Sequence, residues 1–405
     1  MGRLQVGRLR IALLLGVGVL AAAQVGKAMA AAPLLRAAFG LSTAETSWIL
    51  SAFATVGAVG GIAVAAVIRR FAARSAIAAG LALMALGSAV GAASERFAVL
   101  LASRAVEGVG FLFVVVAAPA LIARLAHPNG RAPAMAVWGA FMPTGTGLAL
   151  LAQPLIEPQG WRAAWLGHAA LSAGAALAAL AVLPSEAAPQ SASRSAPTNA
   201  PVQVRAGGPG RLALAFGSYT FLYFALAGLL PIYLMDVLGA DPARAGPLTA
   251  LAVLANGAGN IAAAALLAGS VGAHRLILVG FAVLAAAPIP LYEAQLPPAS
   301  VAAGLMATGL TATLGAAGLI PASLFATAPR AANPDRLPLT LGLLLQASAL
   351  GQFAGPPSLA AWTSAFGWSV APALLIPVAL LGVVAMAGFG RSQEIPEIRS
   401  AKGPR

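Results

Sequence analysis

Two basic residues stand inside long apolar stretches, where a charged side chain facing lipid would cost several kcal/mol. The first, Lys27, lies nine residues before Arg36. The second, Arg104, lies eight residues after Arg96. At 1.5 Å per residue both are roughly 12 Å deep, too far for their charged ends to reach the surface easily. We expect Lys27 to face a wet cavity that holds negative charge; the alternative is a lysine that reaches the lipid headgroups.

Two further residues share these helical faces. Gln24 precedes Lys27 by three positions, so it lies on the same face and could hydrogen-bond an oxygen-bearing ligand. Glu107 follows Arg104 by three positions and is the only acidic residue inside a predicted span. It could form an intrahelical ion pair with Arg104, which would leave Lys27 as the charge that a substrate meets. Alternatively, Glu107 could carry a proton and couple transport to a proton gradient.

The composition requires lipid around most of the surface. Of the 405 residues 60% are hydrophobic and only 9% are charged, whereas a soluble domain carries about a quarter charged residues. The net charge is +13, but the basic residues lie between apolar runs rather than in a patch with aromatic residues, so we expect no nucleic-acid partner. The absence of cysteine excludes disulfides, thiolate metal sites and cysteine nucleophiles.

The apolar runs predict an all-α membrane protein with twelve transmembrane helices in two six-helix bundles. A span needs about 20 apolar residues. Such runs begin near Ile11, Trp48, Ser75, Phe97, Pro133, Ala163, Leu212, Pro247, Leu276, Ala299, Leu337 and Trp368. Residues 184–211 are rich in Ser, Pro, Ala and Gly, which is typical of a flexible linker. We therefore expect bundles at 1–183 and 212–390, and a tail at 391–405.

The positions of Lys and Arg predict the orientation. If the N-terminus is cytoplasmic and the spans alternate, 18 of the 24 basic residues fall on the cytoplasmic side and four in outer loops. Both termini and the linker are then cytoplasmic. The first 33 residues also resemble a cleavable signal peptide, but cleavage would leave eleven spans and place the new N-terminus outside, against this charge bias.

Local motifs resemble those of the major facilitator superfamily of secondary transporters. The segment RAVEGVG is similar to the fourth-helix motif of that family, with Arg104, Gly108 and Gly110 in the matching positions. The arrangement of six spans, a polar linker and six spans supports the same resemblance. In the family the first and fourth helices line a central cavity, which implies that Lys27 and Arg104 supply positive potential there.

Further motifs extend the resemblance over nearly the whole chain. The segment GQFAGPP is similar to a Gly-x-x-x-Gly-Pro motif in the eleventh span, through Gly351, Gly355 and Pro356; the looser fifth-span counterpart, GAFMPTGTG, contains Pro143. The segments GWRAAW (160–165) and GWSVAP (367–372) open the sixth and twelfth spans similarly, as in an internal repeat. Within the superfamily, PLLRAAFGLS and AMAVWGAFMPTG resemble the cyanate and nitroimidazole transporter branch.

The loop after the second span departs from the family pattern. Where the family has an acid in Gly-x-x-x-Asp-Arg-x-Gly, this chain has Arg69, followed by Arg70. The corresponding loop of the second half, GSVGAHR, also lacks the acid. The cytoplasmic charge latch that this motif forms in the family must therefore be absent or rewired.

Neutral polar residues dominate the predicted spans of the second half. Because the seventh helix lines the cavity in the family, the resemblance implies ligand contacts for Tyr219 and Tyr223, which lie four residues apart. Asn256, with Asn260 four positions later, either contacts substrate or only bonds between helices. Gln346, near the middle of the eleventh span, is a further candidate contact. We expect His168 of the sixth span to be satisfied locally, with a proton relay as the alternative. In the tenth span Thr308, Thr311 and Thr313 could equally bond their own backbone.

These observations predict a secondary active transporter that moves a small anionic or polar organic solute by alternating access. Two cations and one acid in the spans favour an anion over a cationic drug. The sequence has no nucleotide-binding glycine loop, metalloprotease motif or nucleophile elbow, so we expect no enzyme and no cofactor. The alternatives are a proton-coupled exporter of hydrophobic compounds and a transport-inactive sensor or scaffold. We expect a monomer in a bacterial inner membrane.

Overall fold

The structure, a computed structural model, describes residues 3–68, 70–127, 134–135, 137–185, 208–269, 271–292, 299–331 and 337–387. Within these ranges the chain is helical and contains no β-strand, which confirms the predicted all-α fold. Most of the predicted linker 184–211, the tail 391–405 and Arg69 lie outside the described residues.

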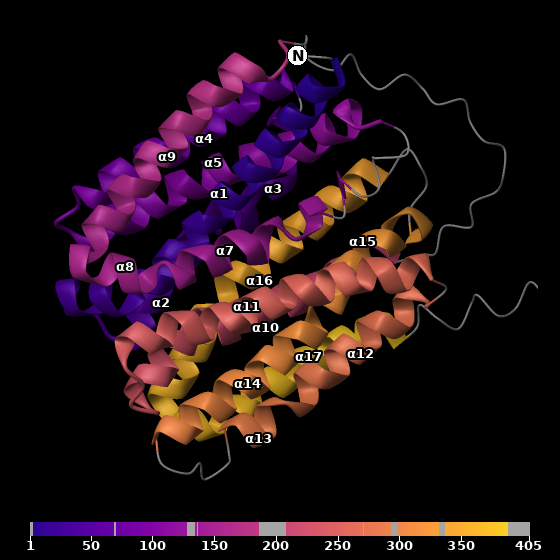
Figure 1. The fold of residues 1–405 in the computed structure, drawn as a ribbon. Helices are drawn as coiled ribbons and strands as arrows, with labels where there is room; N and C mark the ends of the chain where they lie inside the picture. Colours follow the sequence, from indigo (N-terminus) through magenta and orange to yellow (C-terminus); the bar gives the residue numbers. More distant parts are fainter. Residues whose placement is uncertain are drawn as a thin grey trace, which may run out of the picture.

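The first half of the described chain forms one group of helices, called the N-terminal bundle here (Figure 1). Its elements are α1 (Arg3–Phe39), α2 (Thr43–Ala52), α3 (Thr55–Ile68), α4 (Ala73–Ala92), α5 (Phe97–Leu125), α7 (Phe141–Leu151), α8 (Gln153–Ile156), the 3₁₀ turn η1 (Glu157–Gln159) and α9 (Gly160–Val182). A capping box starts α2, because Ser42 Oγ accepts from the Glu45 backbone N–H while the Glu45 carboxylate accepts from the Ser42 backbone N–H. This cap explains why the second span begins before the predicted Trp48.

The second half forms the C-terminal bundle (Figure 1). Its elements are α10 (Gly208–Asp236), α11 (Pro242–Ala268), α12 (Ala273–Ala286), α13 (Pro288–Tyr292), α14 (Ala299–Ala317), α15 (Leu319–Ala331), α16 (Leu337–Phe366), the 3₁₀ turn η3 (Trp368–Val370) and α17 (Ala371–Ala387). Helix α10 is almost wholly buried, since helices α11, α15, α16 and α17 pack around it. It is therefore the central helix of this bundle.

Ten helical segments within the described ranges are long and apolar enough to cross a membrane. The other two predicted spans, beginning near Pro133 and Leu337, correspond to α7 and to the 30-residue helix α16. The predicted tenth span is divided into α14 and α15 at Gly318, next to the Asn256 backbone of α11. The helices thus agree with the twelve-span organisation.

The predicted motif glycines lie at close helix contacts. A Cβ atom at Gly110 would collide with the Gly80 carbonyl oxygen of α4, and one at Gly355 would collide with the Phe221 carbonyl oxygen of α10. Gly351 approaches the backbone of Gly217 in the same way. Small residues allow such close approach where no hydrophobic force drives helices together in lipid.

The faint sequence repeat has a counterpart in backbone geometry. Gly160, at the start of α9, has φ of 78°, and Gly367, before η3, has φ of 85°. Both angles fall in the left-handed region that favours glycine. The two GW segments therefore share a glycine of positive φ near the start of the last helix of each bundle.

The two bundles meet along two seams. In one, α2 and α3 pack against α16, with the Trp48 and Phe353 rings 5.6 Å apart. In the other, α7 packs against α11, where a Cβ atom at Gly257 would lie 3.0 Å from the Pro143 side chain. Glycines at 57, 61 and 257 bring the helices of these seams close together.

One ion pair joins the bundles at the ends of α1 and α10, where Arg36 Nη1 contacts Asp236 Oδ2. We call this the Arg36 end of the molecule; it is the outer end in the predicted topology. Residues from both helices, including Pro33 and Met235, line a surface cavity of about 310 Å³ around the pair. The bundles therefore touch at this end.

Asp236→Asn should lower the free energy of unfolding by less than about 1 kcal/mol, since exposed ion pairs are screened by solvent. The Arg36 and Asp236 side chains are 35% and 40% exposed. Thermal unfolding of the purified variant and wild type, at low and high salt, measures the difference. The small effect should vanish at high salt; a large, salt-independent loss would contradict this assignment.

Candidate functional site

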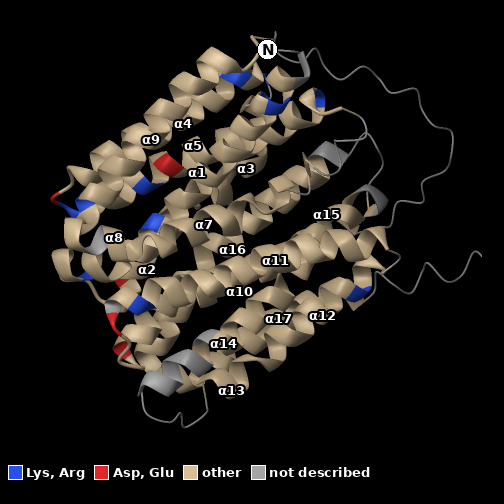
Figure 2. Cartoon of the chain, in the orientation of Figure 1, with Lys and Arg blue, Asp and Glu red and all other residues tan. Residues whose placement is uncertain are grey.

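Charged side chains are concentrated at helix ends, and the C-terminal bundle is uncharged along the middle of its helices (Figure 2). The exception is a group of three fully buried side chains in the N-terminal bundle: Lys27, Arg104 and Glu107. We call these three residues the charge cluster. They come from α1 and α5, which the sequence predicted to contain the intramembrane charges.

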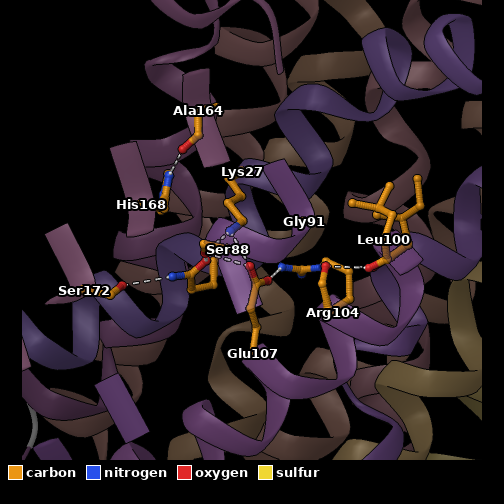
Figure 3. A network of polar contacts seen from close by, with 12 residues as sticks. Lys27, Ser88, Gly91, Leu100, Arg104, Glu107, Ala164, His168 and Ser172 are labelled. Carbon is orange, nitrogen blue, oxygen red and sulfur yellow. Dashed lines mark hydrogen bonds and ion pairs between the residues drawn. The ribbon is translucent and has the colours of Figure 1, made fainter. Parts of the chain in front are cut away.

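Lys27 is bound from three sides (Figure 3). Its Nζ atom lies 2.6 Å from Glu107 Oε1 and 2.6 Å from the Ser88 Oγ of α4. The same ammonium lies 4.6 Å from the centre of the Trp165 ring of α9, a cation–π contact. Lys27 therefore points toward α4, α5 and α9, inside its own bundle.

Arg104 binds the second oxygen of the same carboxylate: its Nη1 donates to Glu107 Oε2. Its Nε donates to the Ile49 carbonyl oxygen of α2 at 3.2 Å, and its guanidinium lies 4.8 Å from the centre of the Phe53 ring. Its Nη2 has no hydrogen-bond partner among the described residues. The predicted intrahelical pair with Glu107 is thus present, and Lys27 joins it.

Gln24 and two serines extend the charge cluster into a polar network (Figure 3). Gln24 Nε2 donates to the Ser172 Oγ of α9 at 3.2 Å, and Gln24 Oε1 lies 3.2 Å from Ser88 Oγ. His168 Nδ1 lies 2.9 Å from the Ala164 carbonyl oxygen of its own helix, as expected for a locally satisfied histidine. The network therefore connects α1, α4, α5 and α9.

The expectation that Lys27 offers unpaired charge to a substrate is wrong for this conformation. The negative charge that it needs comes from Glu107 of the same bundle, and neither side chain has any solvent-exposed surface. Gln24 is also fully buried and bonded within the network. The reason is rotational: the face of α1 that carries Lys27 turns toward α4, α5 and α9 of its own bundle and away from the other bundle.

In the C-terminal bundle two predicted contact residues are bonded to each other. Tyr219 donates its hydroxyl to Asn256 Oδ1 at 3.1 Å, and Asn256 Nδ2 donates to the Leu314 carbonyl oxygen of α14 at 2.9 Å. This chain links α10, α11 and α14. Tyr223 stacks on Tyr219 with ring centres 5.9 Å apart, but its buried hydroxyl has no partner among the described residues. Of these three residues only Tyr223 has its polar side-chain group unoccupied.

Two other predicted polar residues bridge the bundles. Gln346 of α16 forms hydrogen bonds with backbone atoms of α3. Asn260 Nδ2 donates to the Gly139 carbonyl oxygen near the start of α7 at 3.1 Å. Thr313, in contrast, bonds its own helix through the Gly309 carbonyl oxygen, as expected.

The sequence analysis missed three residues of the polar network: Ser88, Trp165 and Ser172. Ser88 lies in GSAVGA, which nothing distinguishes from other small-residue segments. Trp165 belongs to the GWRAAW segment, which predicted the start of its helix but not its contact with Lys27. Within the described ranges no group of three His, Asp or Glu side chains could hold a metal ion.

The fold and the paired charges define a helical membrane protein of two bundles. The sequence profile of the Major Facilitator Superfamily matches residues 14–312, so the chain belongs to this superfamily. No curated protein sequence matches the chain. The proposed resemblance to the cyanate and nitroimidazole branch finds no support in these comparisons.

Solved structures confirm the fold over the whole chain. One is the crystal structure of a bacterial homolog to the human lysosomal transporter Spinster, in an inward-facing and occupied conformation. It has a TM-score of 0.71 and 18% identity, with 98% of both chains covered. The unoccupied inward-facing form of that homolog gives a TM-score of 0.71 and 18% identity, covering 94% of this chain and 96% of that one. At this identity the similarity concerns the fold alone.

Proposed function

We propose that the protein is a secondary active transporter that moves an uncharged polar organic solute by alternating access between its two bundles. Membership of the superfamily supports membrane transport. The observation that carries the substrate class is the pairing of Lys27, Arg104 and Glu107 with one another inside the N-terminal bundle. Their charges are neutralised by the protein itself rather than held ready for an ion.

The C-terminal bundle supports the same proposal. Its described acidic and basic side chains all lie near helix ends: Arg211, Asp236, Asp241, Arg244 and Arg275. A charged solute moving past α10 would find no opposite charge there, and charge without a partner is costly in a low-dielectric environment. A neutral solute avoids this cost.

Tyr223 is the residue that we assign to substrate binding with the most direct support. Its hydroxyl is buried and lacks a partner, a condition that costs free energy until a donor or acceptor arrives. Its ring belongs to a row on α10, in which Phe216 stacks on Tyr219 and Tyr219 stacks on Tyr223. We infer that the solute has a flat or apolar body and one hydrogen-bonding group.

The contacts of Glu107 disfavour its role as a proton carrier. Both of its oxygens accept from Lys27, Ser88 or Arg104, so a proton would have to displace an existing donor. We therefore assign Glu107 a structural role in holding α1, α4 and α5 together. Energy coupling would then involve another group or the solute gradient alone.

Matched pairs of amides and carboxylates should separate the two substrate classes. We expect nicotinamide-like and benzamide-like compounds to raise the melting temperature of the purified protein, and the corresponding carboxylates to leave it unchanged. Stabilisation by the carboxylates alone would contradict the proposal and restore the anion hypothesis. Flux of a stabilising compound in proteoliposomes would exclude a transport-inactive sensor or scaffold.

Tyr223→Phe should weaken binding of a stabilising compound about five- to tenfold, the usual loss for one hydrogen bond. It should not lower the melting temperature of the free protein, because the hydroxyl that it removes has no partner there among the described residues. Titration by thermal shift measures both quantities. Tyr292→Phe is the matched control, because that ring packs against Tyr233 and Trp368, remote from the Tyr219–Tyr223 stack. Equal affinity for Tyr223→Phe and wild type would remove Tyr223 from the site.

A further inference from the structure

Gln346 inserts its side-chain amide into the backbone of a helix of the other bundle. Its Nε2 donates to the Ala58 carbonyl oxygen of α3 at 3.2 Å. Its Oε1 accepts from the Ile62 backbone N–H at 3.4 Å. The two backbone groups are four residues apart, and in an unbroken α-helix they would bond to each other. The Gln346 amide thus takes the place of one backbone hydrogen bond of α3.

Helix α3 is kinked at the same place. Gly60, between the two bonded groups, has φ of −142° and ψ of 25°, outside the helical region. Kinks of this kind arise where a side chain enters the hydrogen-bond ladder of a helix. The position of Gln346 therefore explains both the kink and how its backbone groups remain satisfied.

The contact lies within the seam between the bundles. A Cβ atom at Gly61 would lie 3.4 Å from Gln346 Cβ, and one at Gly57 would lie 2.9 Å from the Ala349 side chain. These glycines bring α16 close enough for the amide to reach the α3 backbone. If α16 moved away, the Ala58 oxygen and the Ile62 N–H would lose a partner from the other bundle but could bond each other.

We propose that Gln346 and Gly60 form a two-state switch that couples the position of α16 to the shape of α3. With α16 docked, the amide holds α3 kinked. With α16 displaced, the Ala58 oxygen and the Ile62 N–H close on each other and α3 straightens. The Ala58 oxygen and the Ile62 N–H are therefore satisfied in both states, so displacement of α16 leaves neither backbone group unpaired.

The direction of the switch follows from the conformation that contains it. Here the amide is inserted while Arg36 and Asp236 join the bundles at the Arg36 end. Contacts that exist in one conformation stabilise it relative to conformations that lack them. Loss of the Gln346 bonds should therefore move the population away from the form that is closed at the Arg36 end.

Distance measurements between paired spin labels test this switch. The chain has no cysteine, so Ala38→Cys on α1 and Val237→Cys next to α10 place labels at two exposed positions of the Arg36 end without competing thiols. The distance distribution is measured by pulsed electron paramagnetic resonance in lipid nanodiscs, in the absence of any solute. The test is therefore independent of the proposed substrate class.

Two variants should change the distribution in the same direction. Gln346→Leu removes both bonds and should shift the ratio of short to long distances toward long distances about three- to tenfold. Gly60→Ala favours a straight helix and should act similarly, by several-fold. Its Cβ meets open space, so a folding defect is not expected. The matched controls should leave the ratio unchanged. They are Gln352→Leu on the same helix, where the buried Nε2 has no partner among the described residues, and Gly174→Ala in open space on α9.

The double variant tests the two-state character of the switch. Because both changes act on the same equilibrium between two states, their fold-shifts in the ratio should multiply in the double variant. A double variant that shifts the ratio no further than either single variant would overturn the proposal. An unchanged distance distribution in Gly60→Ala would also overturn the proposal. This variant keeps Gln346, so it remains informative even if Gln346→Leu fails to fold.

Discussion

Glu107→Gln should destabilise the protein by about 3–5 kcal/mol, the usual loss when one member of a buried ion pair is removed. The carboxylate holds two cations, Lys27 and Arg104, and all three side chains are fully buried. Replacing it by an amide leaves two positive charges in a low-dielectric interior with no negative partner. A sharp loss in melting temperature and in yield of monodisperse protein would show this effect.

Lys27→Met is the matched comparison, because it also removes one charge from the charge cluster but leaves the remaining two charges balanced. The remaining Arg104–Glu107 pair is neutral overall, and Ser88 Oγ still contacts Glu107 Oε1 at 2.7 Å. We expect a cost of only about 1 kcal/mol. If Glu107→Gln and Lys27→Met had the same melting temperature, the Glu107 carboxylate would not be the centre of the network. Its assignment as a structural residue would then be wrong.

The charge cluster shows which part of a membrane site a sequence determines. Position along a helix follows from counting residues, and the structure pairs Lys27 with Arg104 through Glu107. Direction around the helix is different, because only Gln24 shares the face of Lys27 and no continuous polar stripe marks one side of α1. Glu107, the partner of Lys27, is 80 residues away in the sequence. Arg104 already offered Glu107 an ion-pair partner on its own helix, so nothing in the sequence favoured pairing Glu107 with Lys27.

At the seam between the bundles, too, the sequence indicated a polar residue of interest but not its partners. Gln346 was predicted to contact a ligand, because the sequence shows no other partner for a polar side chain inside a span. Its actual partners are backbone atoms, which every residue possesses and which no sequence pattern distinguishes. Gly57 and Gly61 let α16 approach α3 closely, and the helix that approaches them could be identified only from the structure.

The bundle architecture itself was predictable for a physical reason. Each span must satisfy its backbone internally and cover about 30 Å of hydrocarbon, so its length and composition are constrained whatever it packs against. Ten helical segments within the described ranges meet these constraints of length and composition. Contacts between helices carry no comparable constraint, since many arrangements of small residues pack equally well in lipid.

Gly108→Ala should destabilise the N-terminal bundle by about 1–3 kcal/mol through overpacking. A Cβ atom at this position would collide with the Phe53 carbonyl oxygen, which belongs to the break between α2 and α3 and is backbone that a rotamer change cannot move. The displaced segment also carries the Ile49 oxygen that accepts from Arg104 and the Phe53 ring beneath its guanidinium. Overpacking here should therefore also loosen the charge cluster.

Thermal unfolding of Gly108→Ala beside Gly167→Ala separates this collision from the general effect of adding a methyl group to a helix. A Cβ atom at Gly167 meets open space, so that variant should be neutral or slightly stabilised by its better helix propensity. The coupling to the cluster is tested in the Lys27→Met background, where a looser contact around Arg104 should change the cost of Gly108→Ala. Equal melting temperatures for the two glycine variants would mean that α2 yields without cost, and the close approach of α2 and α5 would then have no role in holding Arg104.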